Sequence, residues 1–486
     1  STFAIFWMPL MERNASKTNR LLPMKTDVQG QYIGKESAML LLPSAAEPLI
    51  MSFSIAFTEP TFQRGVCLLV GAILTRGRHT VTAVLRTVGQ WAPGHHTAYH
   101  RVFSRAVWSP WPLGKTLATA ILRWIPADEP VLVPMDDTTA QHRGVHVYGK
   151  GCHHDAVRSS HSHIVWRWGH RWVVLAVSVA FPFIHRRWAL PVLAALYRPE
   201  ELNRAEGRRH KTAPYLARQL MAVLMHWFPR RKFVFLGDGG YASHELARFC
   251  SRHRRHATLV SRFYPDANLY APAPQRKNPV GRPRTKGRKL PQPQDIVKRS
   301  TSIPATVSWY GGGQRHVKLV SGTGGWYKGG DGIVPIRWVF VRDATGTHRD
   351  DYLYTTDPTL KPAQIVSWFT ARWPIETTFQ EVRAHLGFET TRQHVKPSVL
   401  RTAPALLGLF SVVCLIFAEH LRHHRPVVYS TNWYAKTEPT FSDALATVRR
   451  LFWTQLFLTD PTHVKTLKIF PLLLRKTLLD FLCTAA

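Results

Sequence analysis

The chain has 486 residues, of which 64 are Lys or Arg and 30 are Asp or Glu, so its formal net charge is +34 at pH 7. A compact protein with this charge repels itself unless a polyanion neutralises it, which predicts a nucleic-acid partner without separating DNA from RNA. The five cysteines are scattered and form no CxxC pair, which argues against a disulfide framework or a zinc ribbon and favours a reducing compartment.

Residues 1–47 are weakly patterned and are interpreted as an N-terminal extension. Residues 48–127 have a helical pattern, with amphipathic segments at Thr80–Trp91 and Thr97–Arg105 around a Gly-containing turn. This pattern is typical of a helix-turn-helix, whose second helix would offer Arg101 and Arg105 to DNA. An ordinary helical hairpin explains it equally well.

Residues 128–270 give the order strand, strand, strand, helix, strand, helix, strand, which is typical of an α/β core. Two of the apolar runs end in acidic residues. Val131–Met135 precedes Asp136 and Asp137, and the run at 232–237 precedes Asp238. Each run is interpreted as a short buried strand whose carboxylate emerges at the C-terminal edge of the sheet, where open α/β sheets place their sites.

A third acid lies in the segment Thr370–Gly387. If this segment is one helix, Arg372, Glu376 and Arg383 share a face, because they are spaced by four and seven residues. Two strand-end aspartates and a helical glutamate are a ligand set for two hard divalent cations, which act on the oxygens of an in-line phosphoryl transfer. For the helix alone, a surface ladder of salt bridges is the alternative.

With these motifs the chain resembles bacterial insertion-sequence transposases of the DDE class, in the cut-and-paste group with a Tyr-Arg-Glu-Lys signature. The resemblance runs from about residue 50 to beyond residue 410. The chain differs from the signature at two positions, where Phe369 replaces the tyrosine and Arg383 replaces the lysine. The resembling motifs are Asp136-Asp137-Thr138, Asp238-Gly239-Gly240-Tyr241, Arg372-Trp373-Pro374-Ile375-Glu376, Phe379 and Leu386-Gly387.

The resemblance implies an RNase H-like core in which Asp136, Asp238 and Glu376 hold two Mg²⁺ ions, with Mn²⁺ as a substitute. Asp137 stays the alternative to Asp136, because neighbouring strand residues point to opposite faces and only one of them serves the metals well. Further residues expected to contact DNA in or near the site are Arg372, Arg383 and Phe369.

Residues 271–355 are Pro- and Gly-rich at first and then β-like, which predicts an all-β insertion into the core. Its opening loop carries Arg282, Arg284 and Lys286, which suit an A·T-rich minor groove, although a disordered basic loop is an equal alternative. Trp338, with Trp326 beside it as a second candidate, is a possible stacking ring for a base flipped out of the duplex.

Residues 356–400 are expected to complete the catalytic core with Glu376. Residues 401–486 are helical in pattern and would close the core and support dimerisation. The apolar run Ala403–Ala418 is shorter than the roughly 20 residues of a membrane span, so we expect a buried helix and no membrane partner.

These features predict a DNA transposase that cuts and joins DNA at the ends of its mobile element. The expected partners are double-stranded DNA of the terminal inverted repeats, target DNA and a second copy of the chain, in a homodimer assembled on DNA in the bacterial cytoplasm, at the nucleoid. Two alternatives are an RNase H-like nuclease without strand joining and a transposase-derived DNA-binding protein without catalysis.

Overall fold

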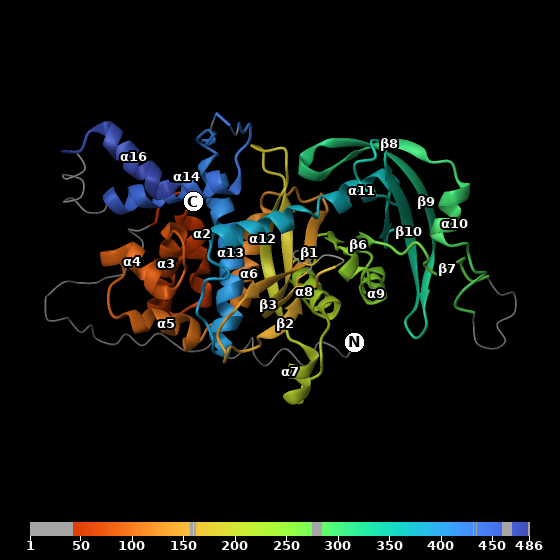
Figure 1. Cartoon of the computed structure of the whole chain (residues 1–486), viewed down its shortest axis with the longest axis horizontal. Coiled ribbons are helices and arrows are strands. Elements are labelled where there is room, and N and C mark those ends of the chain that lie inside the picture. The colour runs from red at the N-terminus through yellow and green to blue at the C-terminus, as the bar shows by residue number, and fades with distance from the viewer. Residues whose placement is uncertain are drawn as a thin grey trace.

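The computed structural model describes residues 42–155, 159, 162–274, 284–430, 432–433, 435–458 and 469–484. Most of the expected extension, residues 1–47, lies outside these ranges, and so does the loop residue Arg282. Helices from both ends of the chain gather at one end of a long sheet, and the β-rich region lies at the other (Figure 1).

The N-terminal region is helical. Prolines in the first turns of α3 and α6 start these helices, because an N–H at that position has no partner within a helix. The expected helix pair is present as α4 and α5, and Gly94 in the turn between them has a φ of +86°. The elements are α2 (Glu47–Met51), η2 (Ser52–Ala56), α3 (Glu59–Leu74), α4 (Val81–Val88), η3 (Gly89–Trp91), α5 (His96–Ser104) and α6 (Pro110–Leu122).

Five strands form the core of the sheet in the order β4-β3-β1-β5-β6. β4, β3 and β1 are antiparallel neighbours, whereas β1, β5 and β6 run parallel. This is the RNase H-like arrangement expected from the sequence. The elements here are β1 (Val131–Gln141), β2 (Gly151–His154), β3 (Trp166–Val179), β4 (Trp188–Tyr197), α7 (Glu200–Ala205), α8 (Ala213–Trp227), β5 (Phe233–Leu236), η4 (Gly239–Tyr241), α9 (His244–Arg252) and β6 (Ala257–Arg262).

β1 is longer than its apolar run predicts. It pairs with β5 over its first four residues only and then continues along β3 to its own end. Asp136 and Asp137 therefore lie inside a strand rather than at its end, just past the parallel ladder. The strand continues because β3 offers backbone partners there, and because Thr138 and Thr139 are β-branched residues that favour extended backbone.

The region between β6 and α11 continues the core sheet, because β11 pairs antiparallel with β6 and β10 and β9 follow, so that the described strands form one 11-stranded sheet. The prediction of an all-β insertion is wrong in one respect: a short helix, α10 (Pro293–Arg299), begins at a proline before β8. The other elements are β7 (Leu269–Tyr270), β8 (Ile303–Ser308), η5 (Tyr310–Gly312), β9 (Gln314–Lys328), β10 (Gly332–Asp343) and β11 (Asp351–Thr355).

The longest described helix, α13 (Lys396–His420), is a core element. Among the described residues it is the one helix long and apolar enough to cross a membrane, yet 67% of its most apolar stretch is buried inside the protein. Ser411 Oγ donates to Pro191 O of β4 at 2.8 Å, and the ring of Phe410 stacks on Phe441 at 4.3 Å. The expected buried helix over this apolar run is therefore confirmed.

The two ends of the described chain are tied together. Arg449 of α14 (Phe441–Leu458) is buried and donates to Ile73 O at 2.7 Å and to Thr75 O at 3.1 Å, at the end of α3. The last carbonyls of a helix have no partner within it, so this arginine caps α3. The remaining helices are α11 (Pro362–Thr370), α12 (Pro374–His385) and α16 (Leu472–Cys483).

Candidate active site

Three acidic side chains lie where the parallel pairing of β1 with β5 ends. Asp136 lies in β1, just past the parallel ladder. Asp238 follows β5 and caps η4 by accepting a hydrogen bond from Gly240 N at 2.9 Å. Glu376 lies in the first turn of α12, where the helix dipole favours an acid. Three separate elements thus bring the predicted carboxylates to one place.

Arg372 links two of these carboxylates. Its Nη1 lies 2.8 Å from Asp136 Oδ2, and its Nη2 lies 2.6 Å from Glu376 Oε1. The prediction of one helix over Thr370–Gly387 is wrong, because Pro374 begins a new helix and leaves Arg372 in the turn after α11. From this turn the buried guanidinium reaches both acids.

Asp137 points to the opposite side of β1 from Asp136. Arg171 of β3 holds it with two hydrogen bonds, from Nε to Oδ2 at 2.6 Å and from Nη2 to Oδ1 at 2.9 Å. The Tyr241 hydroxyl donates to the same Oδ1 at 3.4 Å. A carboxylate paired with a guanidinium in this way has few lone pairs left for a metal ion. The geometry therefore favours Asp136 over Asp137 as the metal-facing residue.

The electrostatics of the cluster disfavour a further negative charge. Burial raises the pKa of Asp136 to about 7; Arg372 opposes this shift, and the neighbouring Asp238 and Asp137 add to it. Burial, together with these three aspartates, also raises the pKa of Tyr241 well above its usual value, so its hydroxyl is a neutral donor. A buried acid in such surroundings is stabilised by a cation placed beside it.

The donor chemistry of Asp136, Asp238 and Glu376 fits a divalent cation, because Mg²⁺ and Mn²⁺ prefer carboxylate oxygens. Within the described ranges, no three His, Cys, Asp or Glu side chains converge closely enough to hold a metal ion as they stand. The guanidinium of Arg372 takes the position between Asp136 and Glu376 and neutralises them in this arrangement.

Arg383 anchors the C-terminal end of α12 to β1. Its Nη2 donates to Thr138 Oγ1 and, at 3.3 Å, to Thr139 O, and its Nε lies 3.8 Å from Glu389 Oε1. These contacts position α12 and hence Glu376 against the strand that carries Asp136. A contact between Arg383 and phosphate stays a prediction.

The two tryptophans considered for base stacking are buried. Trp338 in β10 is 0% exposed, and its indole packs so closely on Gly322 that a Cβ there would lie 2.9 Å from the ring. A ring enclosed in this way cannot stack on a base without unfolding of the sheet, so the assignment of Trp338 to DNA contact is wrong. Trp326 is buried as well and packs against Tyr354 and Phe263.

Arg262 is a basic residue of the site that the motifs did not single out. It ends β6, beside β5, and its Nη2 lies 3.1 Å from Asp351 Oδ2. The guanidinium groups of Arg262 and Arg372 each lie 6.0 Å from the ring centre of Phe369. Because Phe369 is buried beneath these two cations, its assignment to DNA contact is wrong, and it acts in packing. The signal that could have found Arg262 is its place at the end of β6, the strand that pairs with β5.

A small cavity of about 100 Å³ is formed by residues of the β-rich region, by Arg262 at the end of β6 and by residues of α11 that include Phe369. Its aromatic residues Trp309 and Tyr310 lie against His348, with ring centres 5.4 and 6.0 Å from it. These rings, rather than those of the two buried tryptophans, are the aromatic groups that the structure places beside Arg262.

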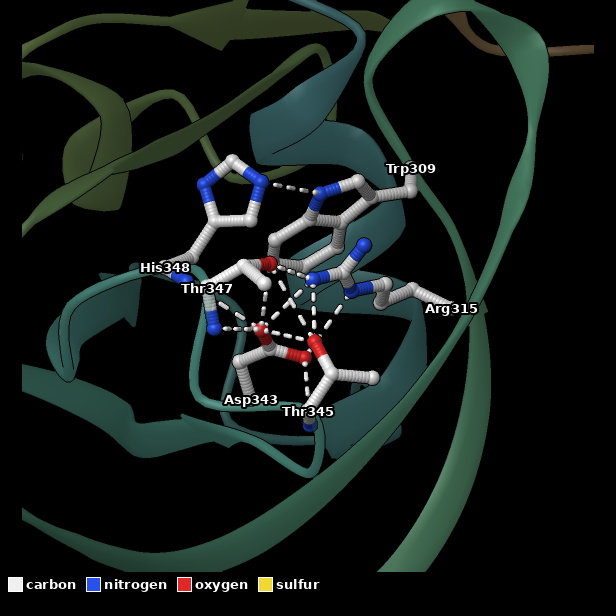
Figure 2. A network of polar contacts seen from close by, with 6 residues as sticks. All are labelled: Trp309, Arg315, Asp343, Thr345, Thr347 and His348. Atoms are coloured by element: carbon white, nitrogen blue, oxygen red, sulfur yellow. Dashed lines mark hydrogen bonds and ion pairs between the residues drawn. The ribbon is translucent and has the colours of Figure 1, made fainter.

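Asp343 fixes the connection between β10 and β11 through a network of polar contacts (Figure 2). Asp343 and His348 of this network also line the cavity. Its carboxylate accepts hydrogen bonds from Arg315 Nε at 2.9 Å and Nη2 at 2.6 Å, and from the backbone N–H of His348 at 3.1 Å. The hydroxyls of Thr345 and Thr347 donate to it at 2.7 and 3.1 Å. Its bonds to Arg315 hold the pKa of Asp343 well below its usual range.

The other residues predicted to contact DNA lie away from the carboxylates in the chain. Arg101 and Arg105 are exposed at the end of α5, and Arg284 is exposed in the basic loop. Lys286 is partly buried, with its Nζ above two tyrosine rings at 4.4 and 3.8 Å. The first three are thus accessible, and their contact with DNA stays a prediction.

Residues 52–316, more than half of the chain, match the family model described as DDE superfamily endonuclease. Asp136 and Asp238 lie inside this range, and Glu376 lies beyond it. No curated protein matches the chain. Among solved structures, the cryo-EM structure of the piggyBac transposase synaptic complex with hairpin DNA is similar at 10% sequence identity and a TM-score of 0.39, over 92% of this chain and 82% of that chain.

Proposed function

Because the chain belongs to the DDE superfamily endonucleases, we propose that it is a DNA transposase, which cuts the ends of its mobile element and joins them to target DNA. The observation that carries the proposal is the gathering of Asp136, Asp238 and Glu376 around Arg372 at one edge of an RNase H-like sheet. A nuclease that cuts without joining needs the same carboxylates, so strand joining requires its own assay.

In this proposal, Asp136, Asp238 and Glu376 hold two Mg²⁺ ions, for which Mn²⁺ can substitute. Bound divalent ions lower the pKa of an attacking water and neutralise charge on the phosphate. Arg372 keeps Asp136 and Glu376 in position before DNA binds, since it donates to both. A guanidinium released from one of these acids is well suited to donate to a phosphate oxygen instead.

The arginines at this edge of the sheet would place the scissile phosphate. The guanidinium groups of Arg262 and Arg372 both lie over the ring of Phe369, which holds one near the end of β6 and the other near Asp136 of β1. Arg383 adds a third positive charge in the last turn of α12, next to Thr138 of β1. Water and then the freed 3′-OH act as the nucleophiles, so no covalent enzyme intermediate is needed.

Double-stranded DNA of the terminal inverted repeats and of the target would follow the exposed cations Arg101, Arg105 and Arg284. Two chains that each carry a net charge of +34 repel each other, and two DNA ends supply the compensating charge. A homodimer assembled on DNA is therefore part of the proposal. Its protein contact is α16, which exposes apolar residues along its length: Leu472, Leu473, Leu474, Leu478 and Phe481.

The test uses DNA fragments that end in the inverted repeats flanking the coding region, together with a supercoiled target plasmid. We expect cleavage and joining only with Mg²⁺ or Mn²⁺. Asp238→Asn and Glu376→Gln should abolish both reactions and leave DNA affinity, measured by fluorescence anisotropy, intact, because each removes one charge at nearly constant shape. Glu419→Gln is the matched control, since Glu419 is an exposed acid whose ion pair is with the neighbouring exposed Arg422, at 2.9 Å.

Three outcomes would overturn the proposal in different ways. Cleavage without joining by the unmodified protein would identify a nuclease. Specific binding of the ends without cleavage under any divalent ion would identify a DNA-binding protein. Full activity of either carboxylate variant would show that the catalytic residues have been assigned incorrectly.

A further inference from the structure

Two tryptophans are exposed side by side on one strand. Trp166 and Trp168 at the start of β3 are 61% and 58% exposed, and they project to the same side because they are two residues apart. Their partners in β2 are His154 and Cys152, both exposed. We call Cys152, His154, Trp166 and Trp168 the tryptophan face. Neighbouring exposed aromatic rings are costly in water and indicate a binding surface.

The tryptophan face lies on the same side of the sheet as Asp136. Asp136 pairs with Val174 of β3, and residues that pair across neighbouring strands project to the same side. Every second residue from Val174 back along β3 projects to this side too, and these residues include Trp168 and Trp166. At about 3.3 Å per residue, Trp168 and Trp166 lie roughly 20 and 26 Å along the strand from the position opposite Asp136.

Arg167, between the two tryptophans, confirms this alternation. Its guanidinium turns away from the tryptophan face, to Asp155 Oδ2 at 3.4 Å and Glu389 Oε1 at 3.6 Å. Both acids near this end of β3 are therefore neutralised by an arginine.

The surroundings of the two rings are positive. Lys150 Nζ lies 5.4 Å from the ring centre of Trp168, and Arg143 and His146 are exposed in the same loop between β1 and β2. A second copy of this chain would bring more positive charge to this surface, which opposes pairing of two such faces. The charge complements a polyanion, and the rings complement flat apolar groups.

We propose that Trp166 and Trp168 form a stacking platform for unpaired bases of the DNA that passes the carboxylates. Aromatic side chains on a strand stack successive bases of a single strand, and neighbouring cations hold its phosphates. Bases inside a duplex already stack on each other, so an exposed flat ring selects for strands whose bases are open. The inference rests on the proposed function only in taking DNA as the partner.

The test compares binding of fluorescent single-stranded oligo(dT) and of the oligo(dA)·oligo(dT) duplex. Trp166→Ala and Trp168→Ala should each weaken oligo(dT) binding about 5- to 150-fold, as expected when one stacked base is lost, and leave duplex binding unchanged. The dependence of log K on log salt should stay the same, because no cation is removed. Trp→Phe variants, which keep a ring, should retain most of the affinity, and Trp→Leu variants should not.

Trp433→Ala is the matched control, because this tryptophan is 87% exposed in a loop outside the sheet. Equal loss of single-strand and duplex binding would overturn the proposal, and so would Leu variants that bind as well as Phe variants. Unchanged oligo(dT) binding together with altered light scattering would show a protein contact instead. If the protein binds oligo(dT) as expected but never joins strands, the proposed function is wrong and the stacking platform still holds.

Discussion

Asp136→Asn should abolish catalysis with little effect on stability, whereas Asp137→Asn should lower stability and keep catalysis. The two residues are neighbours in sequence but serve opposite sides of β1. Asp136 faces Arg372 at 2.8 Å, whereas Asp137 accepts two hydrogen bonds from Arg171 at 2.6 and 2.9 Å. Asn cannot satisfy both donors of Arg171, because its amide nitrogen would face a second donor.

The structure sets the expected magnitudes. Loss of one charge-assisted hydrogen bond costs about 1.5–3 kcal/mol when buried. The side chains of Arg171 and Asp137 are 35% and 22% exposed, so we reduce the cost of Asp137→Asn to about 1–2 kcal/mol. For a chain of this length, that corresponds to a fall in Tm of roughly 1–2 °C. Asp136→Asn should change stability by less than about 1 kcal/mol, since the lost contact to Arg372 is offset by relief of a buried charge.

Differential scanning fluorimetry gives the stabilities, and cleavage of end DNA in Mg²⁺ gives the activities. Asp136→Asn should lose activity at least about a thousandfold, because a metal-facing charge is gone. Asp137→Asn should stay active below its lowered Tm. In the double variant Asp137→Asn, Arg171→Leu the two costs should not add, because both partners of one interaction are removed. An inactive Asp137→Asn beside an active Asp136→Asn would refute the reasoning.

Further predictions concern the packing and the polar network. Gly387→Ala should lower stability by about 2–4 kcal/mol, because φ is +69° there and a Cβ would lie 2.4 Å from His79 Cβ. Gly207→Ala is the control: φ is +62° but the space around it is open, so it should cost about 1 kcal/mol in the same melting assay. Asp343→Asn should lower Tm by an amount that is constant from pH 8 to about 5 and shrinks below about pH 4. The reason is that a carboxyl group with a depressed pKa in the folded state stabilises the fold fully above its unfolded pKa and loses this contribution as the pH falls. A difference in Tm that grows with acid would contradict this. Leu473→Glu should abolish the pairing of two DNA ends, measured by light scattering, and preserve the binding of one end. Ile303→Glu, at a similarly exposed site in β8, should pair two ends normally. If Leu473→Glu also pairs two ends normally, α16 is not the dimer contact.

The strands and the three acids could be predicted because local patterns encode them. Apolar runs that end in carboxylates indicate strand ends, and β5 with Asp238 is found where the run predicts it. The position of Arg372 was missed because Pro374 is compatible with both a continuing motif and a new helix start, and only the packing of α12 decides between them. The partner of Asp137 was also out of reach, since the pairing of β1 with β3 places Arg171 beside it from 34 positions away.

Tryptophan burial shows the same limit. The sequence does not show which of Trp338 and Trp166 is buried, because each lies in a β-like segment rich in aromatic residues. Trp338 is enclosed because Gly322 on the neighbouring strand leaves room for an indole, whereas the pairing of Trp166 with His154 at the end of the sheet leaves its ring open. The neighbours across the sheet, not the local sequence, decide which ring meets solvent.

The cap that Arg449 places on α3 has a consequence for biosynthesis. Ile73 O and Thr75 O leave the ribosome long before Arg449 is translated, so the first helical region is made without the group that satisfies its carbonyls. The pairing of Arg372 with Asp136 likewise joins segments made far apart in time. A nascent or prematurely terminated chain therefore lacks a finished active site. The three carboxylates can gather around Arg372 only after synthesis has passed Glu376.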